Sequence, residues 1–160
     1  MEALRLVHEA DGYPLNWPRD PRAWLAPADA AWVTEAADGT ITGHVAVREI
    51  EGRGELCRLF VIPEARRRSR SPRVRSEEEP PLREEGRLER GVSIGRALVE
   101  RAKAWAAERG YSLTLNVVDE QRSAAVAFYE ATGWRFTHVS DADWAGPDGQ
   151  PVRLRHYEAS

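Results

Sequence analysis

The sequence predicts a single domain in which helices and strands are mixed, and three observations lead to this fold class. The chain has 160 residues, a length that suits one domain with its own core. Some segments alternate apolar and polar residues, as strands do, and others repeat apolar residues at helical spacing. Turns rich in Gly and Pro separate these segments, so each is short enough to be one element.

The N-terminal part is expected to contain a strand, a short helix and a hairpin. Residues 4–9 alternate in the manner of a strand. Asp20 followed by Pro21 is typical of a helix N-cap and first helical position, so a short helix is expected at residues 21–25. Two strands joined by a Gly-containing turn are expected at residues 31–35 and 41–48.

Residues 55–62 are expected to form an interior strand, because both faces of this segment are largely apolar. Simple alternation would place Glu55 and Cys57 on one face, and Leu56 and Phe60 on the other.

A segment with few apolar side chains follows this strand. Residues 66–89 carry mostly arginines first and mostly glutamates later. Such a segment cannot bury enough surface to offset its ordering entropy, so we predict a flexible insertion within one domain that covers residues 1–160. The glutamates neutralise the basic part, which argues against nucleic-acid binding.

The helix expected at residues 94–109 is preceded by a glycine-containing turn and closed by Gly110. Gly91 and Gly95 allow the backbone to approach a ligand closely. The amides of residues 93–97 point out of the positive end of the helix. This arrangement predicts a seat for a phosphate or pyrophosphate group.

The C-terminal part is expected to contain three strands, one helix and one loop. These are a strand at residues 113–118, a helix at 123–132 closed by Gly133, a strand at 134–139, a polar loop at 141–149 and a strand at 152–157.

Composition restricts the class of protein. The net charge of −3 suggests neither a nucleic acid nor an anionic membrane as partner. We expect a cytoplasmic protein, because the sequence has no membrane-length apolar run and no signal-peptide core, and Cys57 is its only cysteine. His8, His138 and His156 lack metal-ligand spacing, and no metal is expected.

The order of elements and three motifs resemble the GNAT superfamily of acyl-CoA-dependent N-acyltransferases over almost the whole chain. The motifs are Leu59-Phe-Val-Ile-Pro63, Arg90-Gly-Val-Ser-Ile-Gly-Arg96 and Ala125-Val-Ala-Phe-Tyr129-Glu-Ala-Thr-Gly133-Trp134. The resemblance implies an α+β fold of three layers (α/β/α). Its central sheet is mixed, mostly antiparallel and splayed, with about six or seven strands and helices on both faces.

The resemblance also implies acetyl-CoA as co-substrate and a set of residues that bind it. Leu59, Phe60 and Val61 would offer backbone groups to the pantetheine arm. The pyrophosphate would lie on the glycine turn, formed by Arg90, Gly91, Val92, Ser93, Ile94, Gly95 and Arg96.

The activity implied is transfer of an acetyl group to a primary amine of a small molecule or protein, by direct attack in a ternary complex. Tyr129 matches the tyrosine that protonates the departing thiolate. Glu55 matches a glutamate that acts through water as general base in some branches of the family, although a solvated charge at a strand start is the preferred interpretation. A structural role is favoured for His44, and a small buried residue rather than a nucleophile for Cys57.

Three departures from the family pattern support an alternative, a catalytically silent acyl-CoA-binding or regulatory module. Ser93 replaces a glycine, Arg122 replaces an asparagine, and the insertion precedes the pyrophosphate turn. The acceptor amine is not identified by the sequence, and a monomer or a homodimer is expected. Three aromatic residues either form an acceptor wall or simply pack: Tyr13, Trp17 and Trp24.

Overall fold

The structure is a computed structural model, and it describes residues 2–11, 13–25, 28–67, 73–76, 93–119 and 124–159. Its strands form one seven-stranded sheet in the order β4-β1-β2-β3-β5-β7-β6. β3 and β5 are parallel, and every other neighbouring pair is antiparallel. The predicted α+β fold with a mixed, mostly antiparallel sheet is therefore confirmed.

Most elements lie where the residue patterns predict them. The helices are α1 (Glu2–Asp11), α2 (Pro21–Leu25), α3 (Ile94–Glu108) and α4 (Ala124–Ala131), with a 3-10 helix η1 (Pro63–Arg67). The strands are β1 (Ala30–Glu35), β2 (Ile41–Ile50), β3 (Arg53–Val61), β4 (Arg73–Ser76), β5 (Leu113–Val118), β6 (Trp134–Ala145) and β7 (Pro151–Ala159).

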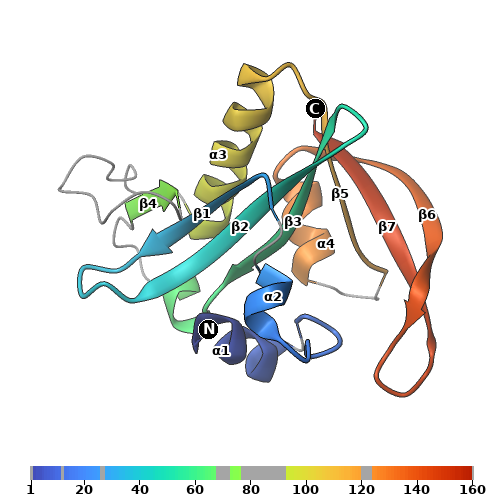
Figure 1. Ribbon diagram of the computed structural model, residues 1–160, viewed down its shortest axis with the longest axis horizontal. Coiled ribbons are helices and arrows are strands. Elements are labelled where there is room, and N and C mark those ends of the chain that lie inside the picture. Colours follow the sequence, from blue (N-terminus) through green and yellow to red (C-terminus); the bar gives the residue numbers. More distant parts are fainter. Residues whose placement is uncertain are drawn as a thin grey trace.

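Helices cover both faces of the sheet (Figure 1). α3 and α4 lie on one side, which we call the back face: a Cβ on Gly43 of β2 would lie 3.0 Å from the side chain of Leu98, and Tyr157 of β7 donates to Glu130 of α4 at 2.9 Å. α1 and α2 lie on the other side, the front face (Figure 1).

The strand expected at residues 4–9 is wrong, because this segment belongs to α1. Leu and His at every second position suggested a strand, yet the side chains that are buried recur at helical spacing. They are Ala3, Leu4 and Val7.

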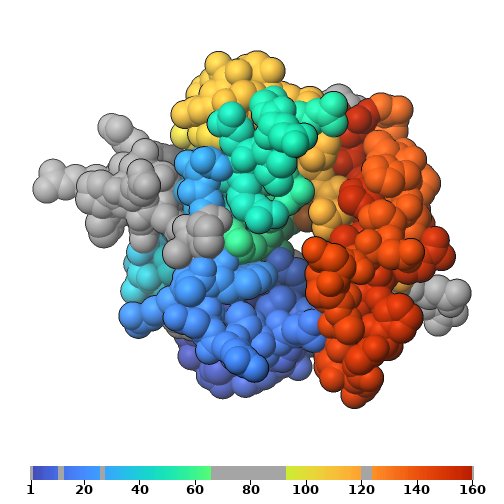
Figure 2. Space-filling model, turned by 45° about the vertical axis from the view of Figure 1, so that its right-hand side comes forward, coloured from blue at the N-terminus to red at the C-terminus, as the bar shows by residue number. Residues whose placement is uncertain are grey.

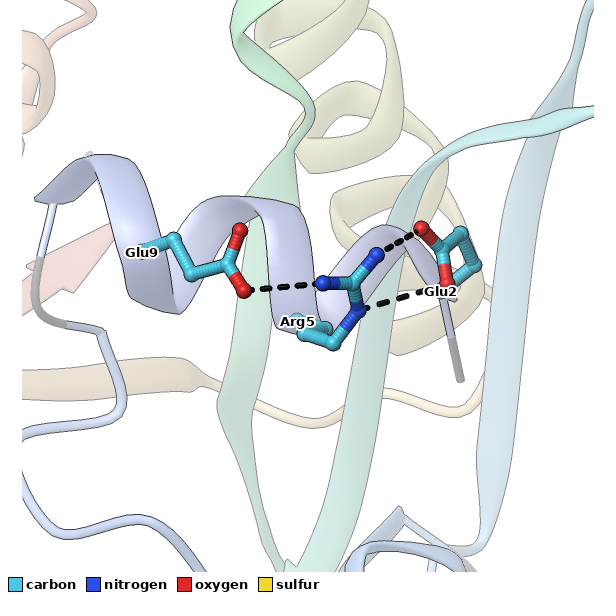
Figure 3. Close-up of polar contacts among 3 residues, drawn as sticks. All are labelled: Glu2, Arg5 and Glu9. Carbon is cyan, nitrogen blue, oxygen red and sulfur yellow. Dashed lines mark hydrogen bonds and ion pairs between the residues drawn. The ribbon is translucent and has the colours of Figure 1, made fainter.

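The exposed side of α1 carries an ion-pair ladder (Figure 3). Arg5 pairs with Glu2 one turn before it and with Glu9 one turn after it, the latter at 2.9 Å. Residues three and four apart are neighbours on a helix surface, and each such pair stabilises the helix by about 0.2–0.5 kcal/mol.

Two segments expected to be loops are strands. Residues 141–145 continue β6, because β6 is an edge strand whose polar side chains stay in solvent. Residues 73–76 form β4, which pairs with β1, although they lie within the predicted flexible insertion. The remainder of that insertion beyond η1 lies outside the described residues.

β3 contains a bulge that reverses the expected alternation. His44 pairs with Phe60 and Ala46 pairs with Cys57, so two residues of β3 oppose one residue of β2. Arg58 has a φ of 52° at this point. Because directly opposed residues share a face, Phe60 lies on the same face as Cys57, and the simple alternation predicted for this strand is wrong beyond the bulge.

β3 and β5 separate soon after they meet. Within the described chain they pair at only two positions, Gly54 with Leu113 and Glu55 with Thr114. Beyond these the strands diverge, as Figure 1 shows. None of the described helices is long and apolar enough to cross a membrane.

Gly43→Ala tests how tightly α3 packs on the sheet. The added methyl would lie 2.7 Å from Thr34 Oγ1 and 3.0 Å from both Ile94 and Leu98, so the helix must shift away from β2. We expect the free energy of unfolding to fall by about 1–3 kcal/mol, the usual cost of overpacking, as measured by urea denaturation. An unchanged urea midpoint would show that the contact is looser than the structure indicates.

Candidate functional site

Tyr129 lies in the core at the side of α4 that faces the sheet, with 5% of its surface exposed. Its ring packs edge-on against Phe128 and Trp134, and tilted against Tyr157. Burial raises the pKa of Tyr129, so its phenol stays protonated at neutral pH. A phenol held in this state can donate a proton.

Two groups from the front side influence the Tyr129 phenol. Tyr13 and Cys57 each raise its pKa further by electrostatic interaction, a smaller effect than that of burial. Burial is also the main cause of the raised pKa of Tyr13 and of the raised pKa of the Cys57 thiol. A protonated thiol is a poor nucleophile, which agrees with the interpretation of Cys57 as a packing residue.

The predicted acceptor wall divides into two parts. Tyr13 and Trp24 contact each other edge-on, and the Arg58 guanidinium lies 5.2 Å from the Trp24 ring. Trp17 instead packs on His8 and is 40% exposed. Tyr13 and Trp24 therefore lie beside the bulge, whereas Trp17 lies apart from them against α1.

His44 holds the bulge from the neighbouring strand. It is buried, its Nδ1–H donates to the carbonyl of Arg58 at 2.9 Å, and its ring stacks on Phe60. These contacts support the structural interpretation of His44 over that of a base.

Glu55, the candidate general base, is paired. Its Oε1 accepts from Arg48 of β2 at 2.5 Å, and this hydrogen bond is the main cause of the raised pKa of Arg48. Glu55 thus has a partner on the neighbouring strand. It is neither a free carboxylate nor the fully solvated charge that is the preferred interpretation of the sequence.

The first turn of α3 begins at an ordinary N-cap. Ser93 has a φ of −66°, which any residue adopts, so glycine is not required there. Its Oγ accepts from the amide of Arg96 at 3.2 Å, and its carbonyl accepts from the amide of Ala97 at 3.0 Å. Two of the five amides expected to be available for a ligand are therefore already bonded. Arg90, Gly91 and Val92 lie outside the described residues.

Gly95 brings α3 close to α4 and β3. A Cβ at this position would lie 3.4 Å from the Phe128 ring and 3.8 Å from Val61. The start of α3, the Tyr129 helix and Val61 at the end of β3 thus converge on one region.

The front face of β5, β7 and β6 carries a polar row that the sequence reading did not identify. Strand register places these residues on the same face as Glu55: Thr114, Asn116, His156 and His138. Figure 2 shows a hollow between the N-terminal residues (blue) and the β6–β7 hairpin (orange and red). Asn16 donates to the carbonyl of Ala145 across these two sides at 2.9 Å.

The two histidines of this row are stacked, with ring centroids 4.1 Å apart and an interplanar angle of 6°. Spacing along the sequence could not have revealed the pair, since it depends on which residues β6 and β7 oppose. Among the described residues, no group of three or more His, Cys, Asp and Glu side chains is placed to hold a metal ion.

Comparison with known proteins supports the predicted resemblance. Residues 87–134 match the model of the Acetyltransferase (GNAT) family, a segment that includes α3 and α4. No curated protein matches the sequence.

Solved structures share the fold at low sequence identity. The ribosomal-protein-S18-alanine N-acetyltransferase from Escherichia coli matches with a TM-score of 0.61 and 16% identity, over 98% of this chain and 88% of that one. Arabidopsis thaliana NAA60 with a bisubstrate analogue matches with a TM-score of 0.64 and 14% identity, over 98% and 90%.

A third similar structure contains acetyl coenzyme A. It is a putative streptothricin acetyltransferase from Bacillus anthracis, with a TM-score of 0.58 and 15% identity, over 91% of this chain and 71% of that one. The chain has the fold of these acetyltransferases, and its resemblance to the GNAT superfamily is confirmed.

The buried phenols predict a loss of stability in alkali. A tyrosine whose folded-state pKa is raised stabilises the fold below its unfolded pKa of about 10, and this contribution is lost as pH rises above that value. In Tyr129→Phe, the slope of the unfolding free energy above pH 10 should be shallower by up to about 1.4 kcal/mol per pH unit, measured by urea denaturation. The same change at the half-buried Tyr111 is the control and should alter the slope less, so equal effects would contradict the burial of Tyr129.

Proposed function

We propose that this chain, which has the GNAT fold and whose residues 87–134 match the family model, is an N-acetyltransferase that uses acetyl-CoA. The acceptor is a primary amine of a small molecule or a peptide. The observation that carries the proposal is the separation of β3 from β5. It occurs near the region where the start of α3 approaches β3 and the helix that carries Tyr129.

The separated strands and α3 suit the two halves of acetyl-CoA. The extended pantetheine arm, with its amide groups, would lie along the backbone of β3 at Leu59, Phe60 and Val61. The pyrophosphate would lie at the start of α3, at residues 90–96, where the helix dipole and the arginines favour negative charge. Ser93 serves here as N-cap, so fewer amides face the phosphates than a glycine turn would offer.

The proposed reaction is direct attack of the neutral amine on the thioester carbonyl carbon. A carbon–nitrogen bond forms, the carbon–sulfur bond breaks, and the Tyr129 phenol gives its proton to the departing thiolate. The remaining extra proton on nitrogen returns to the Tyr129 phenolate, so one proton in total reaches solvent for each ammonium ion acetylated. The Tyr129 phenol is protonated at neutral pH, as a proton donor must be, although the pKa raised by burial makes it a weaker acid.

Two observations favour the alternative of a silent acyl-CoA-binding module. Ser93 Oγ already occupies the Arg96 amide, and Glu55 is held by Arg48. Both features reduce the number of hydrogen-bonding groups that the site has available for a cofactor or a substrate. Turnover measurements distinguish the two functions, because only the enzyme releases CoA when an amine is added.

Acetyl-CoA should stabilise the folded chain, because only the native fold brings β3 and α3 together. At about 100 times the dissociation constant, the gain is roughly 2.7 kcal/mol, or about 5–10 °C in melting temperature for a chain of this size. No shift at millimolar acetyl-CoA would contradict the cofactor assignment.

Gly95→Ala should separate cofactor binding from folding. Alanine favours a helix by up to about 1 kcal/mol over glycine, and its methyl meets Phe128 at an ordinary contact distance, so the free protein should be as stable or more so. The methyl would project into the proposed cofactor region, so stabilisation by acetyl-CoA should shrink. Glu100→Ala, at an exposed position of the same helix, is the control and should keep the full shift.

Tyr129→Phe should lower turnover by about 100-fold or more while leaving stabilisation by acetyl-CoA nearly unchanged, the result expected on loss of a general acid. Release of CoA is followed with streptothricin, spermidine, a lysine-containing peptide and a peptide with an N-terminal alanine as acceptors. Tyr111→Phe serves as the matched control. Equal turnover in the Tyr129 variant and the parent would mean that solvent protonates the thiolate.

A further inference from the structure

We propose that His156 is the base that takes the proton from the acceptor ammonium group, an assignment that rests on the proposed acetyltransferase function. The geometry of the β5–β7–β6 surface points to it, and neither the family match nor the motifs in the sequence select this residue.

His156 lies on the front face, where the acceptor would enter. It opposes Asn116 of β5, which lies two residues beyond the point where β5 leaves β3. Adjacent strands are about 4.8 Å apart, so roughly 10 Å separates the backbones of β7 and β3 where β3 and β5 are still paired, and the separation is larger at Asn116. That distance leaves room for an amine between the imidazole and a thioester held along β3.

A chain of hydrogen bonds fixes the two histidines. The Thr137 hydroxyl has one proton, which it donates to the His156 carbonyl at 3.2 Å. It must then accept from the Nδ1–H of His138, whose Nδ1 lies 2.9 Å away. Ser140 Oγ lies 2.6 Å from His156 Nε2 and, in the proposed state, accepts its proton. This arrangement leaves the Nδ1 lone pair of His156 to receive a proton.

The surroundings of His156 favour its neutral form. Burial lowers its pKa below the usual range, and the stacked His138 lowers it further, while Glu55 acts in the opposite direction. Two carboxylates on this face are paired, Glu55 with Arg48 and Glu158 with Arg135, and the Arg58 guanidinium lies over Trp24 at the bulge. A neutral imidazole at physiological pH is the form that a base requires.

The step is a proton transfer followed by attack. The ammonium nitrogen gives one proton to His156 Nδ1, the neutral amine attacks the thioester as described above, and the imidazolium then releases its proton to solvent. Glu55, held by Arg48, raises the pKa of His156 and would stabilise the imidazolium, which gives this carboxylate a supporting role in place of the direct role that the resemblance implies.

The test uses the full chain with acetyl-CoA and the same four amines. His156→Ala should lower kcat/KM by about 100-fold or more at pH 7, with stabilisation by acetyl-CoA unchanged and with activity at least partly restored by added imidazole. His156→Gln, which keeps a polar group toward Ser140, covers the case in which the alanine variant does not fold. Arg153→Gln, an exposed position of β7, should behave like the parent.

His138→Gln provides a readout that a purely structural role would not change. Without the neighbouring His138 ring the pKa of His156 rises, so the acid limb of the kcat/KM profile should move to higher pH while the plateau stays. Two results with an active parent would overturn the role of His156 alone. In the first, the His156 variants keep at least half of kcat/KM. In the second, imidazole does not restore the lost activity and the pH profile of His138→Gln does not move. A parent that acetylates none of the four amines overturns the proposed function, and this assignment with it.

Discussion

The bulge in β3 is the constraint on which the rest of the candidate site depends. It holds Arg58 at a φ of 52°, a conformation that a non-glycine residue adopts only when its surroundings enforce it. His44 supplies that enforcement, through a hydrogen bond to the Arg58 carbonyl and a stack on Phe60. The extra residue turns Phe60 toward the front face and bends β3, and β3 keeps only two paired positions with β5.

Strands that separate inside a sheet expose backbone polar groups, and these must be covered from both faces. On the back face the cover is α4, which is tied to β7 because Tyr157 and Arg155 both contact Glu130. On the front face Tyr13 and Trp24 close over the bulge. The same cover buries the phenols of Tyr129 and Tyr13 and raises the pKa of both, so the packing that the opening requires also sets the acidity of the proposed proton donor.

Much of the fold could be predicted from the sequence because its signals are local. Pro21, Gly110 and Gly133 mark helix ends through their own backbone preferences, and the structure bears them out, with positive φ at both glycines. The failures concern tertiary context. α1 resembles a strand by alternation until its buried face is known, and residues 141–145 resemble a loop because an edge strand tolerates polar residues on both faces.

The stacked histidines illustrate what no spacing rule could have predicted. Phe136 opposes Tyr157, and with regular pairing Thr137 would oppose His156, which would leave His138 on the other face. A register shift between Phe136 and His138 instead brings the two imidazoles together, and the Thr137 hydroxyl bonds to both residues at that shift. Both sides of the proposed site therefore depend on irregular pairing, at Arg58 in β3 and at Thr137 in β6. Irregularities of this kind are set by cross-strand contacts. The side chains that they bring together can therefore be identified only once the strand register is known.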